Sequence, residues 1–192
     1  MKGHGYAKQT LRDMLATHVP LFLAAYRDAG VTVLDPGDYV LTDTLPMTGP
    51  NPVVLVSSTS SSLYRVTSAD MRTVALYDYA LTVAVLVSSS SVVGDEVAAV
   101  GMRDAILLAV RECLIAESDL AVDAEVVAGS FQDEQTGPSE MLDQQRRPMS
   151  IGSVDLTVRV AETLTVLAGS DGGTITGYDD AYAAHDASEV LT

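Results

Sequence analysis

The stretch that decides the fold reads YDYALTVAVLV and runs from Tyr77 to Val87. Its odd-numbered positions carry bulky side chains and its even-numbered positions carry mostly small ones. Strict alternation of this length predicts a β-strand with two different faces. Because neither face is strongly polar, both can be covered, and we expect this strand to lie at the centre of a sheet.

A different period begins after the serine-rich residues 88–91. From Asp95 to Glu117 the apolar residues recur at the spacing of an α-helix, and acidic residues at its start suit the helix dipole. The residues predicted on the inward face are Ala99, Met102, Ile106, Ala109, Val110 and Cys113. The charged residues predicted on the outward side are Glu96, Arg103, Asp104 and Arg111.

Three further leucines widen the apolar arc of this helix. Leu107 and Leu114 lie beside the predicted core face, and Leu108 lies almost opposite it. This is more apolar surface than one small sheet needs to cover, so we predict that these leucines contact a partner subunit. Cys113, on the inward face, is predicted to be a small buried residue and not a reactive thiol.

The N-terminal part of the chain predicts one helix and several short strands. An apolar stripe over Leu11–Ala29 ends at Gly30, Thr10 resembles a helix cap, and Pro20 is expected to kink or split the helix. The strands expected next are Val31–Leu34, Tyr39–Thr42 and Val53–Val56. The serine-rich residues Ser57–Ser62 are expected to form a flexible connection or a hairpin tip, with Leu63–Val66 as the return strand.

The C-terminal half predicts a hairpin followed by an extended arm. Alternating apolar residues over 122–128 and 153–160 predict two strands, joined by the polar loop Gln132–Pro148. Loops this long are usually functional or disordered, and we expect this one to become ordered only against a neighbour. The interface residues predicted in the loop are Gln132, Met141, Leu142, Arg146 and Arg147, and those predicted in the acidic arm 168–192 are Tyr178 and Tyr182.

Composition limits the class of protein. A chain of 192 residues with 47% hydrophobic content suits one core, so we expect a single domain over 1–167 plus the arm. The expected fold class is α+β, with a mixed, mostly antiparallel sheet, one long helix on a face and an N-terminal helix. No apolar run reaches membrane-spanning length and no signal peptide is evident, so we expect a soluble protein made in a cytoplasm.

The net charge of −15 argues against binding to DNA or RNA, because an acidic surface repels phosphates. It is compatible with a channel through which DNA slides without sticking, or with acidity that serves solubility alone.

A search for chemistry finds no catalytic motif. His4, His18 and His185 lie in three separate parts of the chain, and none has a metal-ligand spacing to another histidine or to Cys113. The nucleophile elbow and the glycine-rich phosphate loops are both missing. We therefore expect neither a metal, a cofactor nor an enzymatic activity.

The order of these elements resembles that of the tail terminator, or tail completion, proteins of long-tailed bacteriophages. The resemblance covers residues 8–166: an N-terminal helix, short strands, the loop of Asn51 and Pro52, the long strand, the long helix and a closing hairpin. It implies a non-enzymatic virion protein that assembles into a ring, expected to be a hexamer. That ring caps the tail tube, ends its polymerisation and contacts the head–tail connector, while DNA passes through the lumen without specific binding.

Other readings remain open from the sequence. A stopper or another neck protein of the same virion has the same kind of element order. A small-molecule-binding module or an enzyme is a different class, for which a convergent cluster of histidines or carboxylates would be the sign.

Overall fold

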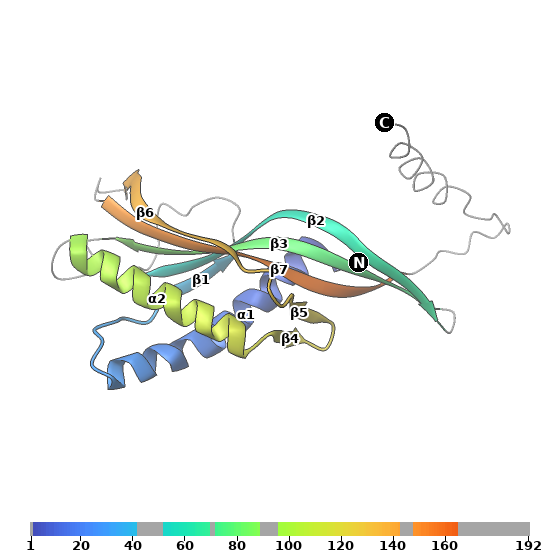
Figure 1. The fold of residues 1–192 in the computed structure, drawn as a ribbon, viewed down its shortest axis with the longest axis horizontal. Coiled ribbons are helices and arrows are strands. Elements are labelled where there is room, and N and C mark those ends of the chain that lie inside the picture. The colour runs from blue at the N-terminus through green and yellow to red at the C-terminus, as the bar shows by residue number, and fades with distance from the viewer. Residues whose placement is uncertain (1, 42–51, 70–71, 89–95, 143–147, 165–192) are drawn as a thin grey trace, which may run out of the picture.

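The computed structural model describes residues 2–41, 52–69, 72–88, 96–142 and 148–164. Within these residues the chain forms two helices and seven strands (Figure 1). They are α1 (Gly3–Asp28), β1 (Asp38–Leu41), β2 (Val53–Ala69), β3 (Arg72–Ser88), α2 (Glu96–Ala116), β4 (Asp119–Ala121), β5 (Ala124–Val126), β6 (Gln132–Leu142) and β7 (Pro148–Leu164).

The strands form one sheet with the order β1-β2-β3-β7-β5-β4, and β6 also pairs with β7. The pairing of β1 with β2 is parallel, and all the other pairings are antiparallel. The expected α+β class, with a mixed and mostly antiparallel sheet, is therefore confirmed.

The central position predicted for the Tyr77–Val87 strand is also confirmed. β3 pairs with β2 from Arg72 to Leu86 and with β7 from Thr73 to Ser88. Its bulky odd-numbered side chains share one core with residues of both helices, which lie on the same face of the sheet (Figure 1). The even-numbered Leu86 belongs instead to a small cluster on the opposite face, with Val53 and Leu55.

α2 agrees with its predicted bounds to within one residue at each end, and its six predicted inward residues are all buried. The prediction for the outward side was wrong for Arg103, because only 5% of its surface is exposed. Its guanidinium donates to Ser150 Oγ at 3.0 Å and to Asp104 Oδ1 at 2.6 Å. The helix lies close enough to β7 for this contact because position 152 is glycine: a Cβ there would lie 3.0 Å from Leu107 Cδ2.

α1 begins earlier than predicted and is continuous. It starts at Gly3, so Thr10 is no cap; its hydroxyl donates to the carbonyl of Tyr6 within the helix. Pro20 lies inside the helix without splitting it. The end was predicted correctly, since Gly30 follows with a φ of +89°, a conformation that glycine adopts without strain.

The serine-rich stretch Ser57–Ser62 is not a hairpin tip. It lies in the middle of β2, which continues through Leu63–Val66, and β2 joins β3 only beyond Ala69. Serine and threonine are tolerated here because Thr59–Thr67 are exposed. Register shifts at Ser58/Ser60 and Leu63/Arg65 show bulges, which accommodate extra residues in one strand.

Two more predictions need correction. Most of the predicted loop Gln132–Pro148 is β6, which pairs with β7 from Gln132 to Leu142, so backbone pairing supplies order that its polar side chains do not suggest. Val31–Leu34 forms no strand, although Val33 is buried in the core.

Candidate functional site

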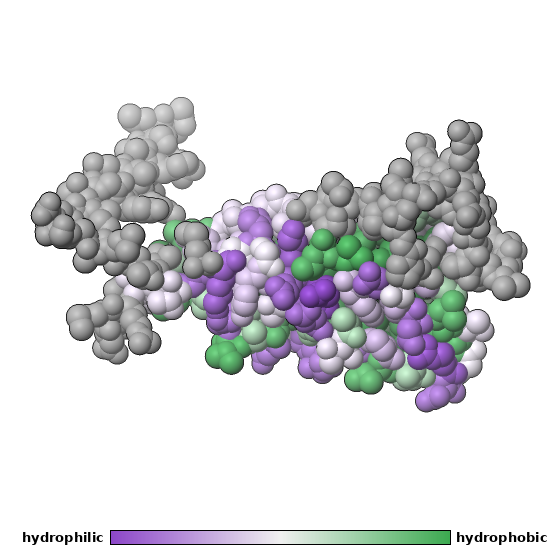
Figure 2. All heavy atoms as spheres, turned by 180° about the vertical axis from the view of Figure 1, so that it is seen from behind, coloured by the Kyte–Doolittle hydropathy of each residue, from purple (hydrophilic) through white to green (hydrophobic). Residues whose placement is uncertain are grey.

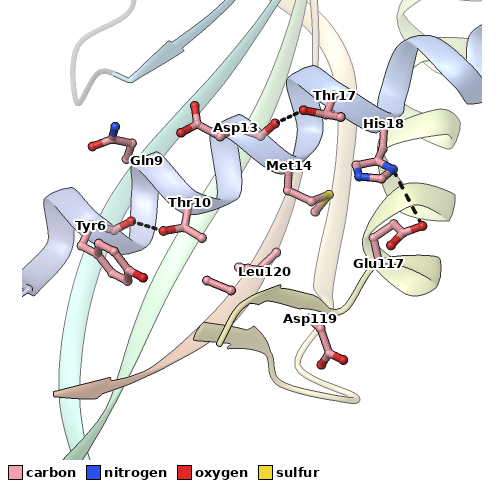
Figure 3. Close-up of a pocket in the computed structure, with 11 residues that line it drawn as sticks. Tyr6, Gln9, Thr10, Asp13, Met14, Thr17, His18, Glu117, Asp119 and Leu120 are labelled. Atoms are coloured by element: carbon pink, nitrogen blue, oxygen red, sulfur yellow. Dashed lines mark hydrogen bonds and ion pairs between the residues drawn. The ribbon is translucent and has the colours of Figure 1, made fainter. Parts of the chain in front are cut away.

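A groove of about 470 Å³ lies between α1 and the segment that follows α2 (Figure 3). Its α1 wall includes Tyr6, Gln9, Thr10, Asp13, Met14, Thr17 and His18, and its other wall includes Glu117, Asp119, Leu120 and Ala121. On α1, Leu15 is buried in the core, and the almost buried Met14 lies where the core borders the groove.

The groove is acidic but holds no evident reaction centre. His18 Nδ1 lies 3.8 Å from Glu117 Oε1, and Asp13 is paired with Arg12 at 2.5 Å. The hydroxyls of Thr10 and Thr17 donate to carbonyls of their own helix. Among the described residues, no group of three or more histidine, cysteine or acidic side chains could hold a metal ion. The groove therefore offers polar contacts to a cationic or neutral group.

A second polar centre fixes the start of α1 to the sheet. Glu162 of β7 has 1% of its surface exposed, and its Oε1 accepts hydrogen bonds from Gly3 N at 2.9 Å and from Tyr79 Oη at 2.7 Å. Burial disfavours the charged form, but the hydrogen bonds from the Gly3 N–H and the Tyr79 hydroxyl, together with the nearby backbone N–H of Lys2, outweigh it and lower the pKa of Glu162. The His4 ring lies edge-on to Tyr79, with centroids 4.9 Å apart.

Buried hydrogen bonds at this centre stabilise the packing of α1 on the sheet. Burial and the bond to Glu162 raise the pKa of Tyr79, so the phenol stays a donor. On the other side of the helix start, Asp123 accepts a hydrogen bond from Tyr6 Oη at 2.5 Å and forms an ion pair with Lys2. The hydrogen bonds from Gly3 to Glu162 and from Tyr6 to Asp123 join the first turns of α1 to segments more than a hundred residues away in the sequence.

The sheet face away from the helices carries a polar ladder. Arg159 donates from Nε and Nη2 to the two carboxylate oxygens of Asp78, at 2.7 and 2.9 Å, and its guanidinium lies 3.6 Å from the ring centroid of Tyr64. The hydrogen bond to Asp78 is the main reason that the pKa of Arg159 is raised. The view from behind shows hydrophilic residues interspersed with smaller apolar areas on the described surface (Figure 2).

Two groups of exposed apolar side chains lie on α2 and on β2, and further exposed apolar residues, Leu21, Val31, Leu34 and Val122, lie elsewhere. On α2, Val97, Leu108 and Ile115 are exposed by 75%, 37% and 64%, and their spacing puts them on one stripe of the helix, here called the α2 outer stripe. On β2, Leu63, Tyr64 and Val66 are exposed by 38%, 56% and 49%. They lie where β2, β3 and β7 extend past the helices as a curved ribbon (Figure 1).

The structure changes the predicted set of interface residues. Leu107 and Leu114 are 1% and 0% exposed and belong to the core of the subunit, so their assignment to a subunit contact is wrong. The extra apolar arc is covered by the subunit itself, since α1 and β7 both pack on α2. Leu108 alone of the three leucines reaches the surface.

The other predicted interface residues lie on β6 or outside the described residues. Gln132, Met141 and Leu142 lie on β6, whose side chains are outside the description. Arg146, Arg147, Tyr178 and Tyr182 are outside the described residues altogether. The arm 168–192 is outside them as well.

Sequence reasoning missed Val97 and Ile115, although their helical spacing from Leu108 was a usable signal. It also missed Glu162, because nothing in an alternating strand distinguishes one buried carboxylate from an exposed one.

No protein-family model matches the chain, and no curated protein matches it at a significant level. No helix of the described part of the chain is long and apolar enough to cross a membrane.

Proposed function

We propose that this chain is a structural protein of a phage virion, one subunit of a ring that closes the tail tube and joins it to the head connector. The proposal starts from the order of elements that resembles the tail terminator proteins. The observation that carries it is the presence of two different exposed apolar surfaces, the α2 outer stripe and the β2 ribbon, on one subunit.

Two unlike surfaces suit the contacts of a ring. In a cyclic assembly of three or more copies, each subunit uses one surface toward the copy ahead and another toward the copy behind. A two-fold dimer would need only one self-complementary patch. The acidic charge adds to this picture, because a lumen with a net negative wall lets DNA slide without adhering.

Mass and shape in solution test the proposal. Light scattering and negative-stain electron microscopy of the full chain, alone and with tail tube protein, should show a closed ring, expected to hold six copies. A double substitution in the α2 outer stripe, Leu108→Lys with Ile115→Lys, should weaken ring formation, because it places charges in a desolvated contact.

A matched control is Leu21→Lys on α1, which is 64% exposed and lies outside both surfaces. It should leave assembly unchanged. A protein that stays monomeric at all concentrations and in the presence of tube ends would contradict the ring, and capture by the connector but never by the tube would favour a stopper role.

A further inference from the structure

Among the described strands, the outer edge of β2 has a partner only at the start of the strand. β1 pairs with β2 only from Val53 to Val56, and among the described strands β3 is the only partner of β2 beyond that point. The stretch Thr59–Ala69, on whose outer side no described strand pairs, is most of β2. Its residues Thr59–Thr67 are all exposed.

Natural sheets usually protect an edge of this length with charges, proline or a covering segment. Here Thr59–Ala69 contains one charged residue, Arg65, and no proline. It carries exposed Leu63, Tyr64 and Val66. Its two bulges twist the edge but leave the uninterrupted runs Ser60–Leu63 and Arg65–Ala69. Such an edge is suited to accept an added strand, with apolar side chains available for contact.

We propose that the β2 edge Thr59–Ala69 binds the C-terminal segment, residues 168–192, of a neighbouring copy as an added β-strand. The inference rests on the proposed ring, which supplies the neighbour. The occupant is argued from where the described chain ends, from its reach and from its charge.

The end of the described chain lies at the same end of the sheet as this β2 edge. Leu164 of β7 pairs with Thr73 of β3, which in turn pairs with Ser68 of β2. Residues 165–192 follow, and a chain of that length can extend up to roughly 90 Å. This is ample to reach the β2 edge of an adjacent subunit in a ring.

The chemistry of the two partners is complementary. Residues 168–192 contain acids and no lysine or arginine, whereas Thr59–Ala69 contains Arg65 and no acid. The segment Thr174–Tyr178 has β-branched and aromatic residues, which favour a strand, and Tyr178 and Tyr182 are large enough to cover the exposed Leu63 and Val66. Backbone pairing supplies affinity in this mode, and side chains on alternate positions supply selectivity.

Hydrogen exchange on the full chain tests the proposal without requiring a ring. A synthetic peptide of residues 168–192 is added at millimolar concentration, comparable to the effective concentration of a tethered segment. Within Thr59–Thr67, which pairs with β3 on one side, only the amides that point away from β3 can bond to an added strand; these are here called the edge amides. The edge amides should then exchange about tenfold more slowly, as expected for newly hydrogen-bonded groups. A scrambled peptide of the same composition should have no effect.

Side-chain variants locate the binding. Leu63→Lys with Val66→Lys should abolish the protection by the peptide, whereas the control Leu21→Lys should keep it. In assembled protein, the edge amides should already be protected without peptide. Protection of the edge amides in dilute monomer would overturn the proposal, because the segment would then cover its own subunit.

The result is separable from the proposed function. Protection by the peptide in a protein that forms no ring would uphold the β2 site and refute the ring. A ring in which the edge amides exchange rapidly, with no response to peptide, would refute the β2 site and leave the ring intact.

Discussion

Replacing Glu162 by alanine should destabilise the subunit by roughly 3 kcal/mol. The substitution leaves Gly3 N and Tyr79 Oη, now 2.9 and 2.7 Å from the carboxylate, without this acceptor in a buried setting. Hydrogen bonds to charged groups contribute about 1.5–3 kcal/mol each. Part of the loss of two such bonds is offset because the variant no longer buries a charge.

Urea denaturation followed by circular dichroism measures this change at pH 7 in protein kept monomeric by dilution. A domain of this size should lose roughly 6–12 °C in melting temperature for the same difference. Tyr79→Phe removes one donor and should cost about half as much. Thr163→Ala is the matched control, since Thr163 is the next residue on β7 and is exposed; exposed substitutions stay within about 0.5 kcal/mol.

The pH dependence of Glu162→Gln gives an independent check. The pKa of Glu162 is lower in the folded protein than in the unfolded chain, where it is about 4.3. The charge therefore stabilises the fold above that unfolded value, and the contribution is lost as the pH falls through the lowered pKa. The gap between wild type and Glu162→Gln should be constant near neutral pH and shrink in acid. An alanine variant as stable as the Thr163→Ala control, or a gap that grows in acid, would refute the reasoning.

Three further substitutions test other contacts, each by the same denaturation assay. Gly152→Ala should cost about 1–3 kcal/mol of stability, because the new Cβ would lie 3.0 Å from Leu107 Cδ2 and 3.2 Å from Arg103 Cδ. Unchanged stability would mean that α2 can move away from β7 freely. Gly101→Ala is the control, because a Cβ at that position meets no atom within 4 Å. Ile106→Asp buries an unpaired charge at a position that is 0% exposed and should cost several kcal/mol, on the order of the whole stability of a domain; a variant that keeps its melting temperature would show the core to be wrongly placed. Arg159→Lys loses the paired bonds to Asp78 and the flat contact with Tyr64, and should cost about 1 kcal/mol at this partly exposed site, whereas a gain in stability would argue against the pair.

The sequence was most informative where one period dominates. β3, β7 and α2 are long segments whose apolar residues repeat every second residue or at helical spacing, so their type and approximate bounds could be predicted. The core face of α2 followed from the same spacing. The burial of the residues beside that face could not be predicted in the same way, because it depends on where α1 packs. Leu107 and Leu114 are therefore predicted at a subunit contact but are buried in the subunit core.

The segments that were predicted wrongly have no regular spacing of hydrophobic residues. β2 beyond Val56 and β6 are built mainly of small or polar residues, and only pairing with β3 and β7 makes them strands. The first turn of α1 contains Gly3 and Gly5, which favour no helix by themselves. Contacts with Glu162 and Asp123 hold this turn in place, and such distant partners leave no local mark on a sequence.

The position of β7 at the end of the described chain affects the order in which the sheet can form during synthesis. β3, β5 and β6 all pair with β7, so these three strands lack one of their partners until the last strand of the described fold has been made. A nascent chain can close the β2–β3 hairpin early, but one long edge of β3 stays open until residues 148–164 leave the ribosome. During that interval an apolar strand edge is exposed to other chains, which is a recognised route to aggregation. A chain interrupted before Leu164 would be expected to keep that edge and to depend on chaperones, however well its helices had formed.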